Sequence, residues 1–179
     1  MLATDFAVTP CSAPASEEWI AEVFANPGFA RHHTDHMVQV DWDTQSGWRN
    51  PRVIPYGPLN LDPMTSALHY GQEIFEGLKA YKNADGSVTL FRPLENARRF
   101  NKSAERLAMP GLPEEVFLEA CDQLVSIDRD WIPDGDGSLY LRPFMFANEI
   151  FLGVKPSSDR KSTRLNSSHV SESRMPSSA

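Results

Sequence analysis

The Asp85-Gly86 pair constrains the fold of this 179-residue chain more than any other local feature. Asp-Gly tolerates the positive φ angles that a tight hairpin turn needs, and residues 77–81 before it alternate in character as a strand does. Residues 87–91 form the natural returning strand. The sequence therefore predicts a β-hairpin whose apolar face has to be covered by another layer of structure.

Two helices are predicted immediately after this hairpin. Pro93 is typical of the first position of a helix, and Pro110 with Gly111 ends it. The positions expected to face inward recur at helical spacing: Leu94, Ala97, Ala104, Leu107 and Ala108. A second helix is predicted from Pro113 to about Trp131. These two helices are the expected cover of the sheet.

Further strands are predicted over residues 36–42, 52–56 and 139–147, and a short helix over residues 65–72. The predicted fold class is α+β, a two-layer arrangement of a mixed sheet with covering helices. A chain of 179 residues is long enough for one domain with a hydrophobic core.

Three regions are expected along the chain. Residues 1–27 form a loose arm and a short helix that Ser16 caps, and residues 28–157 form the domain. Residues 158–179 are rich in serine and contain no aromatic residue, so we expect them to be disordered. The abrupt change in composition favours translated foreign sequence over a regulatory tail.

Composition narrows the classes of partner. The net charge is −7, and the body of the chain is more acidic than that because the serine-rich end is basic, which argues against nucleic-acid binding. No apolar run approaches the ~20 residues of a membrane span, and residues 1–5 do not resemble a secretory signal. We expect a cytoplasmic protein with a small-molecule partner.

Metal and disulfide sites are not predicted. Cys11 and Cys121 are far apart in the sequence, and Cys121 fits a small core residue. His32, His33 and His36 have spacing that metal ligands can use, but no cysteine or carboxylate cluster completes a site.

Tyr140 and Arg142 form the first candidate for chemistry. Because they are two residues apart on a predicted strand, both side chains leave the same face. A guanidinium binds a carboxylate in bidentate fashion, and a phenol adds a hydrogen bond and a flat wall. Pro143 lacks a backbone donor, which fits a sheet edge or a bulge. Taken alone, however, the pair also fits a surface tyrosine beside a salt-bridged arginine.

Other blocks occur in order with this pair, over residues 28–156. They are Phe29, Thr34-Asp35-His36-Met37, His69-Tyr70, Phe75-Glu76-Gly77, Phe91-Arg92-Pro93 with Asn96 and Arg99, Tyr140-Leu141-Arg142-Pro143 and Leu152-Gly153-Val154. Together they resemble the branched-chain amino acid aminotransferases, which have the class IV fold of enzymes dependent on pyridoxal 5'-phosphate (PLP). The blocks cover the first domain of that family.

The resemblance implies roles for individual residues. Arg99 matches the arginine that holds the phosphate of PLP. Phe29, Phe75 and Tyr140 match aromatic walls of the substrate pocket, and Arg142 matches the residue that recognises the side-chain carboxylate of glutamate. We expect Arg99 and the Tyr140–Arg142 pair to converge on one cavity.

The resemblance also implies an assembly and a reaction. Tyr70, Leu152 and Val154 match positions that reach the site of a neighbouring subunit, which implies a homodimer. The implied reaction transfers the amino group of leucine, isoleucine or valine to 2-oxoglutarate, giving the branched 2-oxo acid and glutamate. Asp35-His36 is structural in this family.

The chain departs from the family in one respect. The lysine that binds the cofactor covalently lies in the second domain of the family, so no catalytic residue is assigned here. Lys79 is expected to be a charge at the rim. We therefore expect the polypeptide to be a truncated, inactive fragment.

Two alternatives remain open at this point. A D-amino acid aminotransferase or an aminodeoxychorismate lyase has the same fold, although Tyr140-x-Arg142-Pro143 with Phe75-Glu76-Gly77 favours the branched-chain group. In another class, the chain could serve as a noncatalytic binding or interaction module in which Arg99 keeps weak affinity for phosphate.

Overall fold

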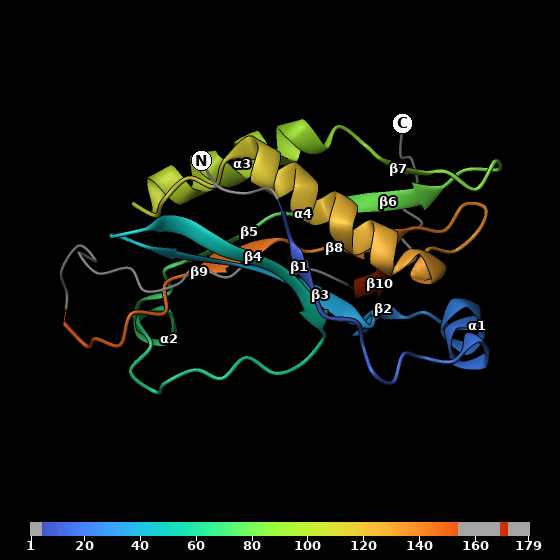
Figure 1. Ribbon diagram of the computed structural model, residues 1–179, viewed down its shortest axis with the longest axis horizontal. Coiled ribbons are helices and arrows are strands. Elements are labelled where there is room, and N and C mark those ends of the chain that lie inside the picture. Colours follow the sequence, from blue (N-terminus) through green and yellow to red (C-terminus); the bar gives the residue numbers. More distant parts are fainter. Residues whose placement is uncertain (1–4, 154–168, 172–179) are drawn as a thin grey trace.

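The computed structural model describes residues 5–153 and 169–171. Helices α3 (Pro93–Arg106) and α4 (Glu114–Ile127) lie together on one side of the strands, so the molecule has a helical layer above a β layer (Figure 1). This arrangement confirms the α+β prediction. In the described part of the chain, no helix is long and apolar enough to cross a membrane.

The first sheet has the order β1-β4-β3. It contributes Val38, Val40, Trp48 and Val53 to the core. Strands β3 (His36–Asp43) and β4 (Gly47–Pro55) pair in antiparallel fashion around a turn at residues 44–46. Strand β1 (Ala7–Val8) pairs with β4 in parallel, with Ala7 opposite Arg52. This parallel pair makes the sheet mixed, as predicted.

The second sheet contains the hairpin around Asp85-Gly86. Its order is β2-β10-β8-β6-β7, and its strands are β2 (Phe29–His32), β10 (His169–Ser171), β8 (Leu139–Leu141), β6 (Leu78–Lys82) and β7 (Val88–Leu90). Gly86 has a φ of 80°, and the amide of Asn83 donates to the carbonyl of Ser87 over 2.8 Å. The predicted hairpin is confirmed.

The predicted strand over residues 139–147 is two strands. β8 pairs with β6, whereas β9 (Phe144–Phe146) pairs with β5 (Glu73–Phe75) in a separate two-stranded sheet. The physical reason lies at Pro143, which has no backbone N–H to continue the ladder. Its carbonyl instead accepts a hydrogen bond from the amide of Glu76 over 2.8 Å.

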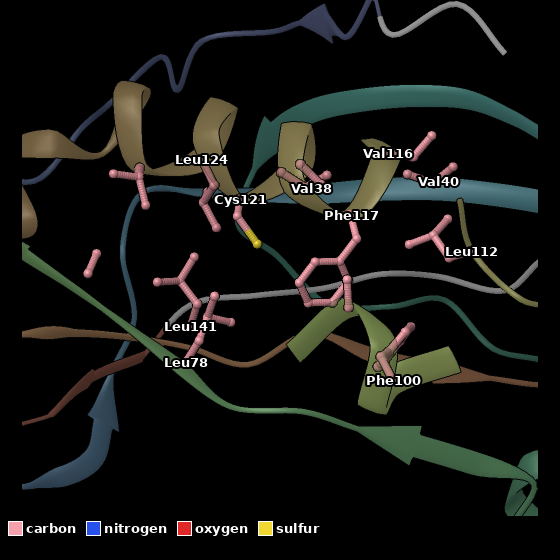
Figure 2. Packing of buried hydrophobic residues seen from close by; sticks show 14 of the residues in the cluster. Val38, Val40, Leu78, Phe100, Leu112, Val116, Phe117, Cys121, Leu124 and Leu141 are labelled. Atoms are coloured by element: carbon pink, nitrogen blue, oxygen red, sulfur yellow. The ribbon is translucent and has the colours of Figure 1, made fainter. Parts of the chain in front are cut away.

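The core lies between the helices and the sheets. Figure 2 shows Phe117 and Cys121 of α4 directed toward Leu78 and Leu141 of the second sheet. Phe117 also packs against Phe100 of α3, with ring centroids 5.6 Å apart. The side chains of β6 and β8 that point at the helices are therefore fixed by burial.

The predicted inner face of α3 is wrong at its C-terminal end. Leu107 and Ala108 are exposed because the helix ends at Arg106 and the chain then turns with a φ of 51° at Ala108. Met109, just beyond this turn, is buried instead. The predicted spacing of inward-facing residues therefore holds only as far as the last turn of α3.

From residue 5 onward, the N-terminal arm packs against the domain, unlike the loose segment predicted for this region. Phe6 is buried, β1 pairs with β4, and the amide of Thr9 donates to the carbonyl of Val53 over 2.9 Å. The edge of β4 offers backbone groups that any sequence can pair with, so a short strand forms without periodicity. Helix α1 (Glu17–Ala25) follows, and the Ser16 hydroxyl caps it as predicted by accepting from the amide of Trp19.

The described part of the serine-rich end also differs from the prediction of disorder. Residues 169–171 form β10, which lies between β2 and β8. Ladder hydrogen bonds join backbone groups, so a polar composition does not prevent them. The remaining residues of the predicted tail, and the boundary at residue 157, lie outside the described residues.

A second short helix and a 3-10 turn complete the fold. Helix α2 (Ser66–Tyr70) precedes β5, and η1 (Arg129–Trp131) follows α4. Two backbone hydrogen bonds hold the start of α2 against the segment that follows β9: the amides of Ser66 and Ala67 donate to the carbonyls of Glu149 and Ala147.

Candidate functional site

Part of the candidate site lies on the face of β6 and β8 that points away from the helices. Leu78 and Leu141 are opposite each other in the ladder and are buried under the helical layer. Because side chains alternate along a strand, Lys79 and its partner Tyr140 point to the other face, together with Arg142. The register of these two strands therefore brings residues distant in sequence onto one surface.

A cavity of about 390 Å³ opens between β6, the loop that follows β7 and the first turns of α3. Its lining residues are Gly77, Leu78, Lys79, Tyr81, Phe91, Arg92, Glu95, Asn96 and Arg99. Three of these side chains are basic, and two are aromatic. The cavity thus combines positive charge with flat apolar surface.

Arg99 projects from α3 and makes a specific ion pair. Its Nη2 lies 2.9 Å from Oε2 of Glu76, and the arginine side chain is 61% exposed while that of the glutamate is 14% exposed. The other glutamate oxygen, Oε1, accepts from the amide of Gly77 over 3.1 Å. The neighbouring Arg98 does not line the cavity and pairs with Glu95 at 2.8 Å, as its position around the helix predicts.

The loop before α3 has an unusual backbone. Arg92 precedes the helix with φ 48° and ψ 49°, a left-handed conformation that residues other than glycine rarely adopt. This turn leaves Arg92 and Phe91 exposed at the cavity. Among the described residues, no carboxylate forms an ion pair with Arg92 or with Lys79.

The guanidinium of Arg142 contacts two aromatic rings. Its Nε donates to the hydroxyl oxygen of Tyr140 over 3.1 Å, and its guanidinium carbon lies 4.6 Å from the ring centroid of Phe75 and 5.2 Å from that of Tyr140. In the described chain, no carboxylate pairs with this guanidinium. The terminal N–H groups of Arg142 therefore remain able to bind an anion.

Gly77 joins this aromatic group to the cavity. A Cβ atom at Gly77 would lie 2.2 Å from the hydroxyl oxygen of Tyr140, so only glycine allows the approach. The buried Asn96 donates from Nδ2 to the carbonyl of Gly77 over 3.0 Å and fixes the segment to α3. Arg99 lines the cavity, whereas Tyr140 and Arg142 border it through Gly77. The three side chains therefore do not line one common cavity, and we treat the Arg99 cavity and the Phe75–Tyr140–Arg142 group as two adjacent candidate subsites.

The remaining predicted site residues lie elsewhere or outside the described part. The hydroxyl of Tyr70 donates to the carbonyl of Leu152 over 2.5 Å, both side chains are about half exposed, and neither lines the cavity. Phe29 begins β2, and its side chain is not described. Val154 lies outside the described residues.

Sequence reasoning missed several residues of the site. Tyr81 and Arg92 line the cavity although no motif assigns them a role there. Asn96 had a usable signal, because it lies three residues before Arg99 and so shares its helix face. For Glu76, which belongs to one of the resembling blocks, no local pattern predicts a partner 23 positions away in the sequence.

Asp35-His36 has a structural role, as expected. Nδ1 of the buried His36 lies 2.6 Å from Oδ1 of Asp128, and Nε2 accepts from the amide of Cys11 over 2.8 Å, so the ring proton resides on Nδ1. Burial raises the pKa of Asp128 above its ordinary value, against the opposing effect of hydrogen bonds from Thr34 and His36. Within the described ranges, no group of three or more His, Cys, Asp or Glu residues could hold a metal ion.

Comparison with known proteins identifies the relatives of this chain, although no family model matches it. The chain is 54% identical over 157 residues to a branched-chain-amino-acid aminotransferase of Mycolicibacterium smegmatis, an alignment that covers 87% of this chain and 43% of that protein. The chain belongs to the branched-chain aminotransferase family. It is also 53% identical over 131 residues to branched-chain-amino-acid transaminase 1 of Bacillus subtilis, covering 73% of this chain and 37% of that protein.

A solved structure of this family has the same fold. The T.th. branched-chain amino acid aminotransferase, complexed with N-(5'-phosphopyridoxyl)-L-glutamate, superposes with a TM-score of 0.54 and 28% identity, covering 74% of this chain and 41% of that one. The described chain corresponds to the class IV N-terminal domain. It spans about two fifths of the length of the curated relatives that it matches.

Proposed function

We propose that this chain is the N-terminal part of a PLP-dependent branched-chain amino acid transaminase. The proposed reaction moves the amino group of leucine, isoleucine or valine to 2-oxoglutarate. The observation that supports it most is the pair of subsites at Gly77, one with Arg99 and one with Tyr140 and Arg142, in a chain 54% identical to a protein named for this activity. The two subsites match the two charged ends of a cofactor–substrate pair.

The first subsite fits the phosphate end of PLP. Arg99 uses Nη2 for Glu76, which leaves its other N–H donors for a phosphate oxygen. Lys79 and Arg92 add positive charge to the same cavity, and Tyr81 and Phe91 add aromatic surface. When bound, PLP supplies the electron sink that allows a proton to leave the substrate α-carbon. Arg99 anchors the cofactor and orients it.

The second subsite fits both amino partners of the reaction. Phe75 and Tyr140 offer the apolar walls that an aliphatic side chain needs, and Phe29 is proposed as a third wall. Arg142 can bind the side-chain carboxylate of glutamate. Because the flat guanidinium lies against the two rings, it can remain covered when an aliphatic substrate occupies the pocket.

The other proposed features concern partners and the covalent step. We propose a homodimer in which the exposed Tyr70 and Leu152, together with Val154, reach the neighbouring subunit's site, and we propose a cytoplasmic location. Lys79 lines the cavity and Lys82 pairs with Asp134 at 3.0 Å, and neither is assigned the covalent role. The 179-residue chain by itself is expected to show no turnover.

A segment exchange tests the proposal. This chain would replace the matching segment of the M. smegmatis relative, and glutamate formation from 2-oxoglutarate would be followed with leucine, with D-alanine and with no amino donor. We expect leucine to support glutamate formation and D-alanine to support none. A folded exchange protein that prefers D-alanine would favour a D-amino acid aminotransferase. Release of pyruvate from aminodeoxychorismate would favour the lyase.

A further inference from the structure

We propose that Glu76 is a positioning residue that holds the guanidinium of Arg99 in the orientation needed to bind a phosphate ester. This inference rests on the proposed function, because Arg99 is the residue assigned to the cofactor phosphate. Glu76 itself does not touch the ligand in this proposal. It acts through the 2.9 Å contact between its Oε2 and Nη2 of Arg99.

Glu76 is fixed at its backbone and at its side chain. Its amide donates to the carbonyl of Pro143 over 2.8 Å, and it directly follows β5, which is paired with β9. Its side chain is 14% exposed, and Oε1 accepts from the amide of Gly77. A carboxylate held in this way offers Arg99 a stationary partner.

Arg99 needs such a partner more than most side chains of the cavity. It is 61% exposed, and a long arginine side chain on a helix surface samples many rotamers when nothing holds it. Oε2 of Glu76 is buried, and in the described part of the chain its contact is this ion pair without an aligned hydrogen bond. The pair therefore orders the arginine at the edge of the cavity while leaving its other donors unused.

A competing interpretation predicts that removing Glu76 strengthens phosphate binding instead of weakening it. A carboxylate close to a phosphate site also repels the phosphate, so its removal would tighten binding if charge alone mattered. Glu95 provides the matched control for this effect. It lines the same cavity, but it pairs with Arg98 at 2.8 Å and not with Arg99.

The binding experiment compares Glu76→Gln with Glu95→Gln in the 179-residue chain. The probe is pyridoxine 5'-phosphate, which carries an alcohol in place of the PLP aldehyde and cannot react with lysines, and unphosphorylated pyridoxine is the second ligand. Calorimetric titration would measure both affinities. We expect Glu76→Gln to weaken binding of the phosphate ester about tenfold, because an unheld Arg99 would lose about one charge-assisted hydrogen bond to the phosphate, and to leave binding of pyridoxine unchanged. Glu95→Gln should not weaken the binding of either ligand. Equal or tighter binding of the phosphate ester by Glu76→Gln would overturn the inference.

A second measurement does not require any ligand. The Nε–Hε resonance of Arg99, identified by its disappearance in Arg99→Lys, should show a high heteronuclear NOE in the wild-type chain and a low one in Glu76→Gln. An unchanged NOE in Glu76→Gln would overturn the positioning role even if the phosphate ester binds as expected. If wild-type chain binds the phosphate ester no better than pyridoxine, the proposed cofactor role fails, and the NOE still decides whether Glu76 orders Arg99.

Discussion

Gly77 is the residue at which the two subsites meet, and its lack of a side chain is what permits this. The hydroxyl oxygen of Tyr140 occupies the position next to where a Cβ would lie, at 2.2 Å. The same glycine accepts a hydrogen bond from Asn96 through its carbonyl. Tyr140, which also accepts from Nε of Arg142, therefore lies next to a segment that Asn96 ties to α3.

Gly77→Ala should therefore displace Tyr140 and destabilise the fold. We expect a loss of roughly 1–3 kcal/mol in the free energy of unfolding, because the added methyl group overpacks a fixed contact. Gly57→Ala is the control, since no atom lies within 4 Å of its Cβ position. Denaturant unfolding of both variants would measure the difference, and equal stabilities would show that Tyr140 moves without cost.

Cys121 is a core residue whose thiol should be inert. Burial raises the pKa of Cys121 from 9.0 to about 12, with a further contribution from Asp122. Iodoacetamide at pH 8 should therefore label Cys11, which is partly exposed, and leave Cys121 unmodified until the chain is unfolded. A Cys11→Ser variant should show no labelling in the native state, and its labelling would contradict the burial of Cys121.

The same thiol should make the fold sensitive to alkaline pH. Because the folded pKa of Cys121 is raised, its contribution to stability is complete below pH 9.0 and is lost as pH rises toward about 12. The expected loss is on the order of 1 kcal/mol per pH unit within this window. Urea unfolding of wild type and Cys121→Ala from pH 8 to 11 would reveal it as a steeper decline in the wild type. Parallel declines would contradict it.

Among the elements, β8 and β9 show most clearly what the sequence could and could not predict. The apolar pattern over residues 139–147 predicted strand structure, and it is present on both sides of Arg142-Pro143. The change of partner from β6 to β5 could not be predicted, because it depends on which strand edge is open after Pro143. The hairpin and α3 were predictable because their signals, Asp85-Gly86 and Pro93, are local.

The segment before β3 illustrates the same limit in the N-terminal arm. Its order comes from contacts with distant residues: Cys11 with His36, Ala15 with Asp35, and β1 with β4. None of these contacts has a local pattern. The same limit applies to the candidate site. The shared face of Tyr140 and Arg142 could be predicted because the two residues are close in sequence, whereas the ion pair between Arg99 and Glu76 could not.

Asp128 joins three elements, and its loss should be costly. It accepts from the amide and Nδ1 of His36 in β3 and lies between α4 and η1. Asp128→Ala would remove this acceptor from two donors of a buried histidine, so we expect a loss of roughly 2–5 kcal/mol in unfolding free energy. Asp130→Ala, at an exposed position of η1, should change stability by less than about 0.5 kcal/mol. Similar values for the two variants in denaturant unfolding would contradict the role of Asp128.

At the scale of the whole molecule, helices cover one face of the strands. In the candidate site, Tyr140 and Arg142 lie on the other face, and the Arg99 cavity opens between β6 and α3. Exposed aromatic and aliphatic side chains border that site or the α2 region: Leu68, Tyr70, Phe75, Phe91, Ile150 and Leu152. Exposed apolar side chains gathered in this way are typical of a surface that binds a ligand or another protein segment. The proposed function accounts for the two subsites on this side of the molecule.

The affinity of the chain for N-(5'-phosphopyridoxyl)-L-glutamate tests the central claim most directly, because this ligand has a phosphate at one end and a glutamate carboxylate at the other. We predict that Arg99→Lys and Arg142→Lys each weaken its binding about tenfold, since lysine cannot replace the planar fork of a guanidinium. Arg98→Lys, on the neighbouring helix position, should bind as the wild type does. Wild-type affinity in both the Arg99 and the Arg142 variants would contradict the account.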